Sequence, residues 1–138
     1  MRGLLADVNV ERHARYLNQL LEHLSLWSVL AEFHLELVTF RDVGLPRDLL
    51  DRPLWNRCQD DGWVLFTENR NRDDEDSLEA TLADSWHVGN LPVLTLSSKS
   101  AFEGRARYRE QVATDVAEVL FGVIQGEYLD QPRIYVPR

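Results

Sequence analysis

Short apolar runs alternate along this chain with segments that have the spacing of an amphipathic helix. The run at residues 63–67 (WVLFT) is apolar up to its last residue, which is typical of a strand buried on both faces. Similar runs at residues 3–7, 34–40, 91–96 and 133–136 predict four more strands. Because parallel strands need a crossover that a helix can supply, the alternation predicts an α/β fold. We expect a three-layer sandwich with a mainly parallel, twisted sheet of about five strands.

Length and composition narrow the classes of protein further. The 138 residues are close to the usual size of one domain, so we expect a single domain over residues 1–138. With 15 basic and 23 acidic residues the net charge is −8, which argues against broad, non-specific binding to nucleic acid. A local site stays open, since a bound divalent cation inverts the local charge. The single cysteine, Cys58, cannot form an internal disulfide, and neither a signal peptide nor a membrane span is recognisable, so we expect a cytoplasmic protein.

Polar side chains gather where the predicted strands end. In a parallel sheet the ligand binds beyond the carboxyl ends of the strands, where connections from distant parts of the chain meet. The candidates in these connections are Asp7, Asn9, Asp51, Glu68, Asn69 and Asp76. Carboxylates at one edge repel each other and ionise together only when a cation compensates their charge.

This pattern predicts a Mg²⁺ or Mn²⁺ site, because both ions prefer oxygen ligands. Asp7, Asp51 and Asp76 would be the catalytic carboxylates, Glu68 would be a further possible metal ligand, and Asn9 and Asn69 would orient water or substrate. A metal held in this way activates a water molecule and neutralises charge on a phosphate.

Some of the same side chains also have ordinary structural interpretations. Asn9 is a good cap for the helical spacing that follows it. Asp51 lies two residues before Pro53 and can be a plain helix cap. Asp76 and Glu79 resemble a capping box that opens a helix. The sequence leaves both kinds of interpretation open.

Six segments together resemble a known family. They are LLADVNV near the start, DVGLPRDLLDRPLW, WVLFTENRN, DSLEAT, LPVLT and the closing RIYVP. They resemble the bacterial PIN-like domain proteins, which are relatives of the PIN-domain nucleases, over nearly the whole chain. The resemblance implies a twisted parallel sheet flanked by helices, in agreement with the fold that the alternating pattern predicts.

The resemblance also implies a function. PIN-domain nucleases hold Mg²⁺ or Mn²⁺ with acidic residues at the carboxyl edge of the sheet and cut RNA, and many are toxins paired with an antitoxin. Asp7 matches the acid that ends the first strand, and Asp51 matches the acid at the start of the mid-domain helix. Nuclease relatives tend to have aspartates two and four residues after the threonine of their third strand, whereas Asn69 and Asn71 follow Thr67 here.

We therefore expect a metal-dependent endoribonuclease with RNA as substrate, an antitoxin protein as a partner, and association as a homodimer as a further possibility. The two asparagines favour an alternative, in which a catalytically inactive PIN-like fold acts as a binding or assembly module. A third candidate is a receiver-like phosphoacceptor, since Asp7, Thr67 and Lys99 follow strands in a similar order. That candidate lacks the paired acids expected after the first strand.

Overall fold

Five parallel strands form one sheet in the part of the chain that the structure, a computed structural model, describes, which is residues 1–68 and 77–138. The strands are β1 (Gly3–Ala6), β2 (Glu36–Thr39), β3 (Trp63–Thr67), β4 (Val93–Leu96) and β5 (Arg133–Val136), in the spatial order β2-β1-β3-β4-β5. Every neighbouring pair is parallel. The predicted α/β fold is confirmed.

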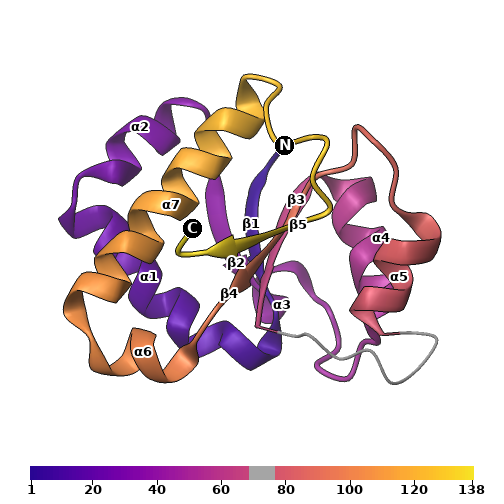
Figure 1. The fold of residues 1–138 in the computed structure, drawn as a ribbon, viewed down its shortest axis with the longest axis horizontal. Coiled ribbons are helices and arrows are strands. Elements are labelled where there is room, and N and C mark those ends of the chain that lie inside the picture. The colour runs from indigo at the N-terminus through magenta and orange to yellow at the C-terminus, as the bar shows by residue number, and fades with distance from the viewer. Residues whose placement is uncertain (69–76) are drawn as a thin grey trace.

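Helices cover both faces of the sheet and complete the three layers (Figure 1). The helices α1 (Glu11–His23), α2 (Leu26–Glu32), α6 (Lys99–Gly104) and α7 (Ala106–Ile124) share one core with the sheet, and α3 (Phe40–Val43), α4 (Asp51–Asp61) and α5 (Leu78–Ser85) share the other. Side chains of β1 alternate between the two cores: Leu4 and Ala6 face the first and Leu5 the second. Covered on both sides, β1 and β3 are buried throughout, which explains their continuous apolar sequence.

The second strand differs from its predicted bounds of residues 34–40. It is shorter, and Phe40 already begins α3, where the sequence predicts a loop after the strand. The cause is a capping box, because the Asp42 carboxylate accepts a hydrogen bond from the backbone N–H of Thr39 at 2.8 Å. Since β2 is an edge strand with only partly buried side chains, burial constrains its length less than it constrains β3.

The cap after β1 is also different from the predicted one. Asp7, and not Asn9, caps a short 3₁₀ turn (Val8–Val10), and α1 begins only after that turn. Asp7 can do this because its backbone is extended, which brings its carboxylate to the N–H of Val8. The side chain of Asn9 is therefore available for contacts with β3.

The other two predicted caps are replaced by neighbouring residues. Leu50 occupies the cap position of α4, so that Asp51 is the first residue of the helix and no cap. Ser77 caps α5, because its hydroxyl accepts a hydrogen bond from the N–H of Ala80 at 3.2 Å. The capping role predicted for Asp76 falls to Ser77, and Asp76 itself lies outside the described residues.

The carboxyl ends of β1 and β3 point toward the lower edge of the molecule in Figure 1. The connection that leaves β1 runs over one face of the sheet, through α1 and α2, and the connection that leads into β3 runs over the other face, through α3 and α4. Because the chain changes faces between them, β1 and β3 form the switch point where such sheets bind ligands. None of the helices in the described part of the chain is both long and apolar enough to cross a membrane.

Candidate functional site

Asp7 lies at the switch point, directly after β1. Only 7 % of the residue is exposed. Its Oδ1 accepts a hydrogen bond from the backbone N–H of Val8 at 2.7 Å, and its Oδ2 accepts one from the hydroxyl of Thr67 at 2.9 Å. Because Thr67 is the last residue of β3, the carboxylate is held by the ends of both central strands.

Asn9 extends this contact to the next residue of the chain after β3. Since the hydroxyl of Thr67 donates its hydrogen to Asp7, the amide nitrogen of Asn9 is the donor toward Thr67 Oγ1, at 3.4 Å. The amide oxygen of Asn9 accepts a hydrogen bond from the backbone N–H of Glu68, also at 3.4 Å. Asp7, Asn9 and Thr67 thus form one polar cluster at the carboxyl ends of β1 and β3.

Asp51 comes to the same place from the start of α4. Its Oδ2 accepts a hydrogen bond at 3.1 Å from the backbone N–H of Leu78, the first residue of α5. The carboxylate therefore lies at the N-termini of two helices, where unpaired N–H groups favour a negative charge. The charge of Asp51 is one of the causes that raise the pKa of Asp7, so the fold brings Asp51 close enough for its charge to act on Asp7.

Glu68 and Lys99 form an ion pair along the same edge. The Nζ atom of Lys99, the first residue of α6, lies 3.6 Å from Oε1 of Glu68. Both side chains are more than one third exposed, so the pair is weak and can rearrange when a ligand binds. The positive charge of Lys99 also reaches Asp7, where it lowers the pKa of the carboxyl group.

The pKa of Asp7 is raised above its ordinary value of 3.8. Burial is the largest cause, and the charge of Asp51 acts in the same direction. The hydrogen bonds from Thr67 and Val8 and the charge of Lys99 oppose the rise without cancelling it. Ionisation of Asp7 is therefore less favourable in the folded protein than in the unfolded chain, and a bound cation would offset this cost.

This raised pKa predicts a pH dependence of stability. The folded state holds a proton on Asp7 over a pH range in which the unfolded chain, with a pKa near 3.8, has already lost it. The contribution of Asp7 to stability is therefore fully present below pH 3.8 and is lost as the pH rises through the folded pKa. Urea denaturation of the metal-free wild type and of Asp7→Asn, repeated at several pH values above 3.8, measures how the free energy of unfolding depends on pH. The variant should gain stability relative to the wild type as the pH rises, and a constant difference would contradict the raised pKa.

The chemical composition of the cluster fits a hard divalent cation. Asp7 and Asp51 offer carboxylate oxygens, and Asn9 offers an amide oxygen. No three or more His, Cys, Asp or Glu side chains among the described residues are grouped to hold a metal. A cation here would take one or two carboxylates and complete its shell with water or substrate oxygens, as Mg²⁺ usually does. The predicted contributions of Asn69 and Asp76 lie outside the described residues.

Thr67 and Lys99 belong to this cluster although the sequence pattern assigned neither of them to the metal site. Thr67 is the last residue of a buried strand, and its hydroxyl is directed toward Asp7. Lys99 is the only lysine of the chain and follows β4 by three residues. The sequence did contain a signal for both residues, because each lies at or just after the carboxyl end of a predicted strand. Polar residues at that edge of a parallel sheet share one site.

No protein-family model, curated protein or solved structure matches this chain. The fold and the polar cluster therefore describe the protein as a three-layer α/β protein with an acidic site at its switch point. Membership of the PIN-like family stays a prediction from the resemblance in sequence.

Proposed function

We propose that this protein is a metal-dependent endoribonuclease of the PIN-like class. The observation that carries the proposal is the convergence of Asp7 and Asp51, from separate parts of the chain, at the switch point of the sheet. Two neighbouring carboxylates, one of them buried, repel each other, and a divalent cation is a partner that relieves this repulsion. The resemblance in sequence supports the same two residues.

Each residue of the cluster has a role in this proposal. Asp7 and Asp51 hold Mg²⁺ or Mn²⁺, which supplies an activated water molecule and neutralises charge on the phosphate of the substrate. Thr67 keeps the carboxylate of Asp7 in one orientation through its hydrogen bond. Asn9 presents its amide group to water or substrate, and Lys99 adds a positive charge that attracts a phosphate. Glu68 or Asp76 completes the ligand set.

RNA is the proposed substrate because the related nucleases cut RNA. An antitoxin protein as partner, a homodimer and a cytoplasmic location are further parts of the proposal.

The proposed cytoplasmic location agrees with the state of Cys58, which is a buried free thiol. Burial raises its pKa to about 12, so the thiol is neutral and unreactive, and the protein needs no oxidising compartment.

The test is to measure binding of Mn²⁺ and cleavage with the same preparation. Thermal melting should show a stabilisation of about 2–3 kcal/mol when Mn²⁺ is present at about a hundred times its dissociation constant. End-labelled single-stranded RNA should be cut in Mn²⁺ and left intact in EDTA. Cleavage that persists in EDTA would contradict the proposal.

The alternative is a catalytically inactive PIN-like fold that acts as a binding or assembly module. It is favoured by Asn69 and Asn71 in place of aspartates after Thr67, and by the ion pair that already joins Glu68 to Lys99. A melting temperature that does not change with millimolar Mn²⁺, together with intact RNA, would decide for this alternative.

A further inference from the structure

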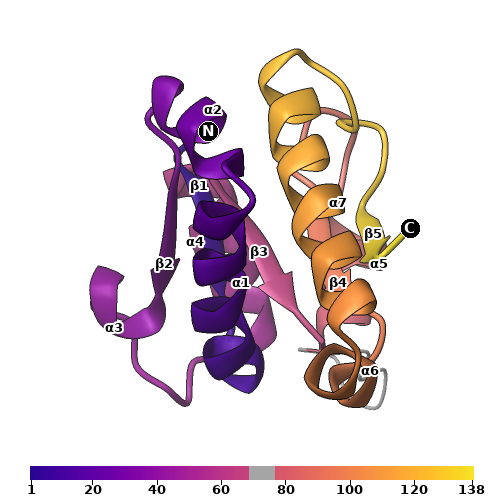
Figure 2. The same ribbon diagram turned by 90° about the vertical axis from the view of Figure 1, so that its left-hand side faces the viewer.

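A groove follows α1 and α7 away from the candidate site. Its first part is a cavity of about 270 Å³, lined by Arg12, His13, Tyr16, Phe102, Glu103 and Arg109. A second cavity of about 330 Å³ shares Tyr16 and Arg109 with the first and continues along α1 to His23. The two cavities therefore adjoin, and Figure 2 shows the helices that form them, α1 and α7, side by side with α6 at their lower end. Such a row of cavities suits an extended ligand better than a single small molecule.

The wall between the two cavities is held in place. The guanidinium group of Arg109 lies 5.1 Å from the ring centre of Tyr16, and its Nη1 donates hydrogen bonds of 3.0 Å to the carbonyls of Phe102 and Glu103. The ring of Phe102 meets that of Tyr16 edge-on, with centroids 6.0 Å apart. Tyr16 nevertheless keeps 44 % of its surface exposed. An exposed ring that its neighbours hold still is a platform on which a nucleobase can stack.

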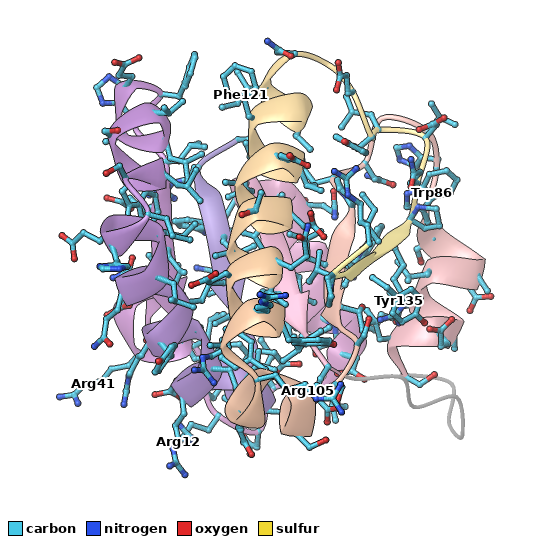
Figure 3. The ribbon with its side chains drawn as sticks, turned by 60° about the vertical axis from the view of Figure 1, so that its left-hand side comes forward. Arg12, Arg41, Trp86, Arg105, Phe121 and Tyr135 are labelled. Atoms are coloured by element: carbon cyan, nitrogen blue, oxygen red, sulfur yellow. The ribbon has the colours of Figure 1, made fainter. Side chains whose placement is uncertain are left out.

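Exposed arginines stand beside the groove, although the chain as a whole carries −8 and the acids Glu103 and Glu110 also line its cavities. Arg12 lines the first cavity, and Arg105 and Arg107 are the chain neighbours of Ala106, which lines the second. All three side chains are exposed, and none forms an ion pair with another residue of the described part of the chain. Figure 3 shows Arg12 and Arg105 at the same end of the molecule. Exposed arginines at one end of an acidic protein favour a ligand with several negative charges.

One residue that lines the first cavity, Glu103, favours a base over a phosphate there, and its side chain is 65 % exposed. Glu103 contributes a carboxylate to its lining, and Oε1 of that carboxylate lies 2.8 Å from Nε2 of His13. A carboxylate repels phosphate and accepts hydrogen bonds from the N–H groups of a base edge. Bases inside and phosphates at the rim are the arrangement that proteins use for single strands, whose bases are free to turn outward.

The groove begins next to the proposed cleavage site. Phe102 and Glu103 follow Lys99 by one turn of α6, and Arg12 and His13 follow Asn9 by a similar step into α1. One helical turn advances roughly 5 Å, so the lining of the first cavity begins about one turn along these helices from Lys99 and Asn9.

We propose that this groove binds single-stranded RNA, with a base in the first cavity against Tyr16 and the backbone phosphates on Arg12, Arg105 and Arg107. The choice of RNA rests on the proposed nuclease function, which this inference extends by placing the substrate. Binding itself needs no metal ion, so that it can be measured separately from cleavage.

The first test measures the stacking contact. A fluorescein-labelled oligouridine of about 12 nucleotides is titrated with protein in EDTA and followed by fluorescence anisotropy. Tyr16→Ala should weaken binding by about 5- to 150-fold, the range found for one stacked base. Tyr135→Ala on β5 is the matched control, because Tyr135 is 42 % exposed against 44 % for Tyr16. The control should stay within about twofold of the wild type.

The second test measures the phosphate contact. The logarithm of the binding constant falls linearly with the logarithm of the salt concentration, with a slope of about −0.7 per phosphate contact for single strands. Arg12→Ala should make this slope shallower by about 0.7. Arg57→Ala removes an exposed arginine from α4, on the opposite face of the sheet, and should leave the slope unchanged.

The outcomes separate this inference from the nuclease proposal. Absence of RNA binding at low salt, or equal losses of RNA affinity for Tyr16→Ala and Tyr135→Ala, would refute RNA binding in the groove. A protein that binds RNA through Tyr16 in EDTA but never cuts it in Mn²⁺ would keep the groove and refute the nuclease. RNA cleavage that is unaffected by Tyr16→Ala and Arg12→Ala would support the nuclease and refute the RNA-binding groove. Circular dichroism of each variant checks that it is folded.

Discussion

Replacement of Asp7 by asparagine is expected to lower Mn²⁺-dependent RNA cleavage by at least about 100-fold, the scale of losing one group that stabilises charge in a transition state. Asparagine has nearly the same shape, and its amide oxygen can still accept the hydrogen bond from Val8. Its amide nitrogen can donate to Thr67, which in the wild type donates to Asp7. The local structure should therefore persist while the negative charge is lost. Initial rates on end-labelled single-stranded RNA give the measurement.

The same substitution should stabilise the metal-free protein at pH 7, because it removes a buried charge whose pKa is raised by burial and by Asp51. Activity and stability would then change in opposite directions, as happens when a functional group is kept at a cost to the fold. Asp130→Asn, an exposed acid just before β5, is the matched control and should alter neither property.

Equal cleavage by wild type and Asp7→Asn would point to a contaminating nuclease and would remove Asp7 from the site. Lower cleavage together with lower stability would also contradict the expectation, because the loss would then follow from unfolding. The two measurements together therefore separate a functional role of Asp7 from a purely structural one.

Replacement of Gly3 by alanine should have the largest effect on stability, a loss on the order of 3 kcal/mol or more. Gly3 begins β1 with φ at +139°, a conformation that residues with a side chain rarely adopt. A Cβ atom at this position would overlap the backbone carbonyl of Glu36 on the neighbouring strand β2. Backbone in a sheet cannot move aside without loss of pairing. Because whole domains are stable by only about 5–15 kcal/mol, such a loss is readily measured by urea denaturation.

Gly104→Ala is the control for this substitution. A Cβ atom on Gly104 would meet no other atom within 4 Å, and the residue is the last of α6. Alanine favours helix over glycine by up to about 1 kcal/mol, so stability should be unchanged or slightly higher. Similar urea midpoints for Gly3→Ala and the wild type would show that β2 can move away from β1, contrary to the close approach seen here.

The sequence predicted best those elements whose consecutive side chains are buried, because they leave a clear apolar pattern in the sequence. The continuous apolar run of β3 and the closing strand β5 have the predicted bounds, and Gly62 ends α4 as expected, in a left-handed conformation. The edge strand β2 was predicted too long, because half-buried side chains give a weak pattern. Helix α2 was not predicted, since its chain reversal depends on Ser25 at a φ of +59°, which serine does not signal.

The site was predicted in its residue types and not in its contacts. Position after a strand was enough to select Asp7, Asn9 and Glu68, because all parallel strands end at one edge. It could not show that Thr67 would hold the carboxylate of Asp7, or that Asp51 would accept a hydrogen bond from the start of α5. Each of these bonds joins residues that are distant along the chain.

The amino-acid sequence by itself determined that this protein is an α/β sandwich with acidic residues at the carboxyl edge, because local spacing reports which side chains are buried. Only the tertiary structure decided which strands are neighbours, and with them the pairing of Asp7 with Thr67 and the groove that Tyr16 and Arg109 share. The physical reason is that strand order depends on how helices cross over the sheet, and a periodic pattern carries no record of that choice.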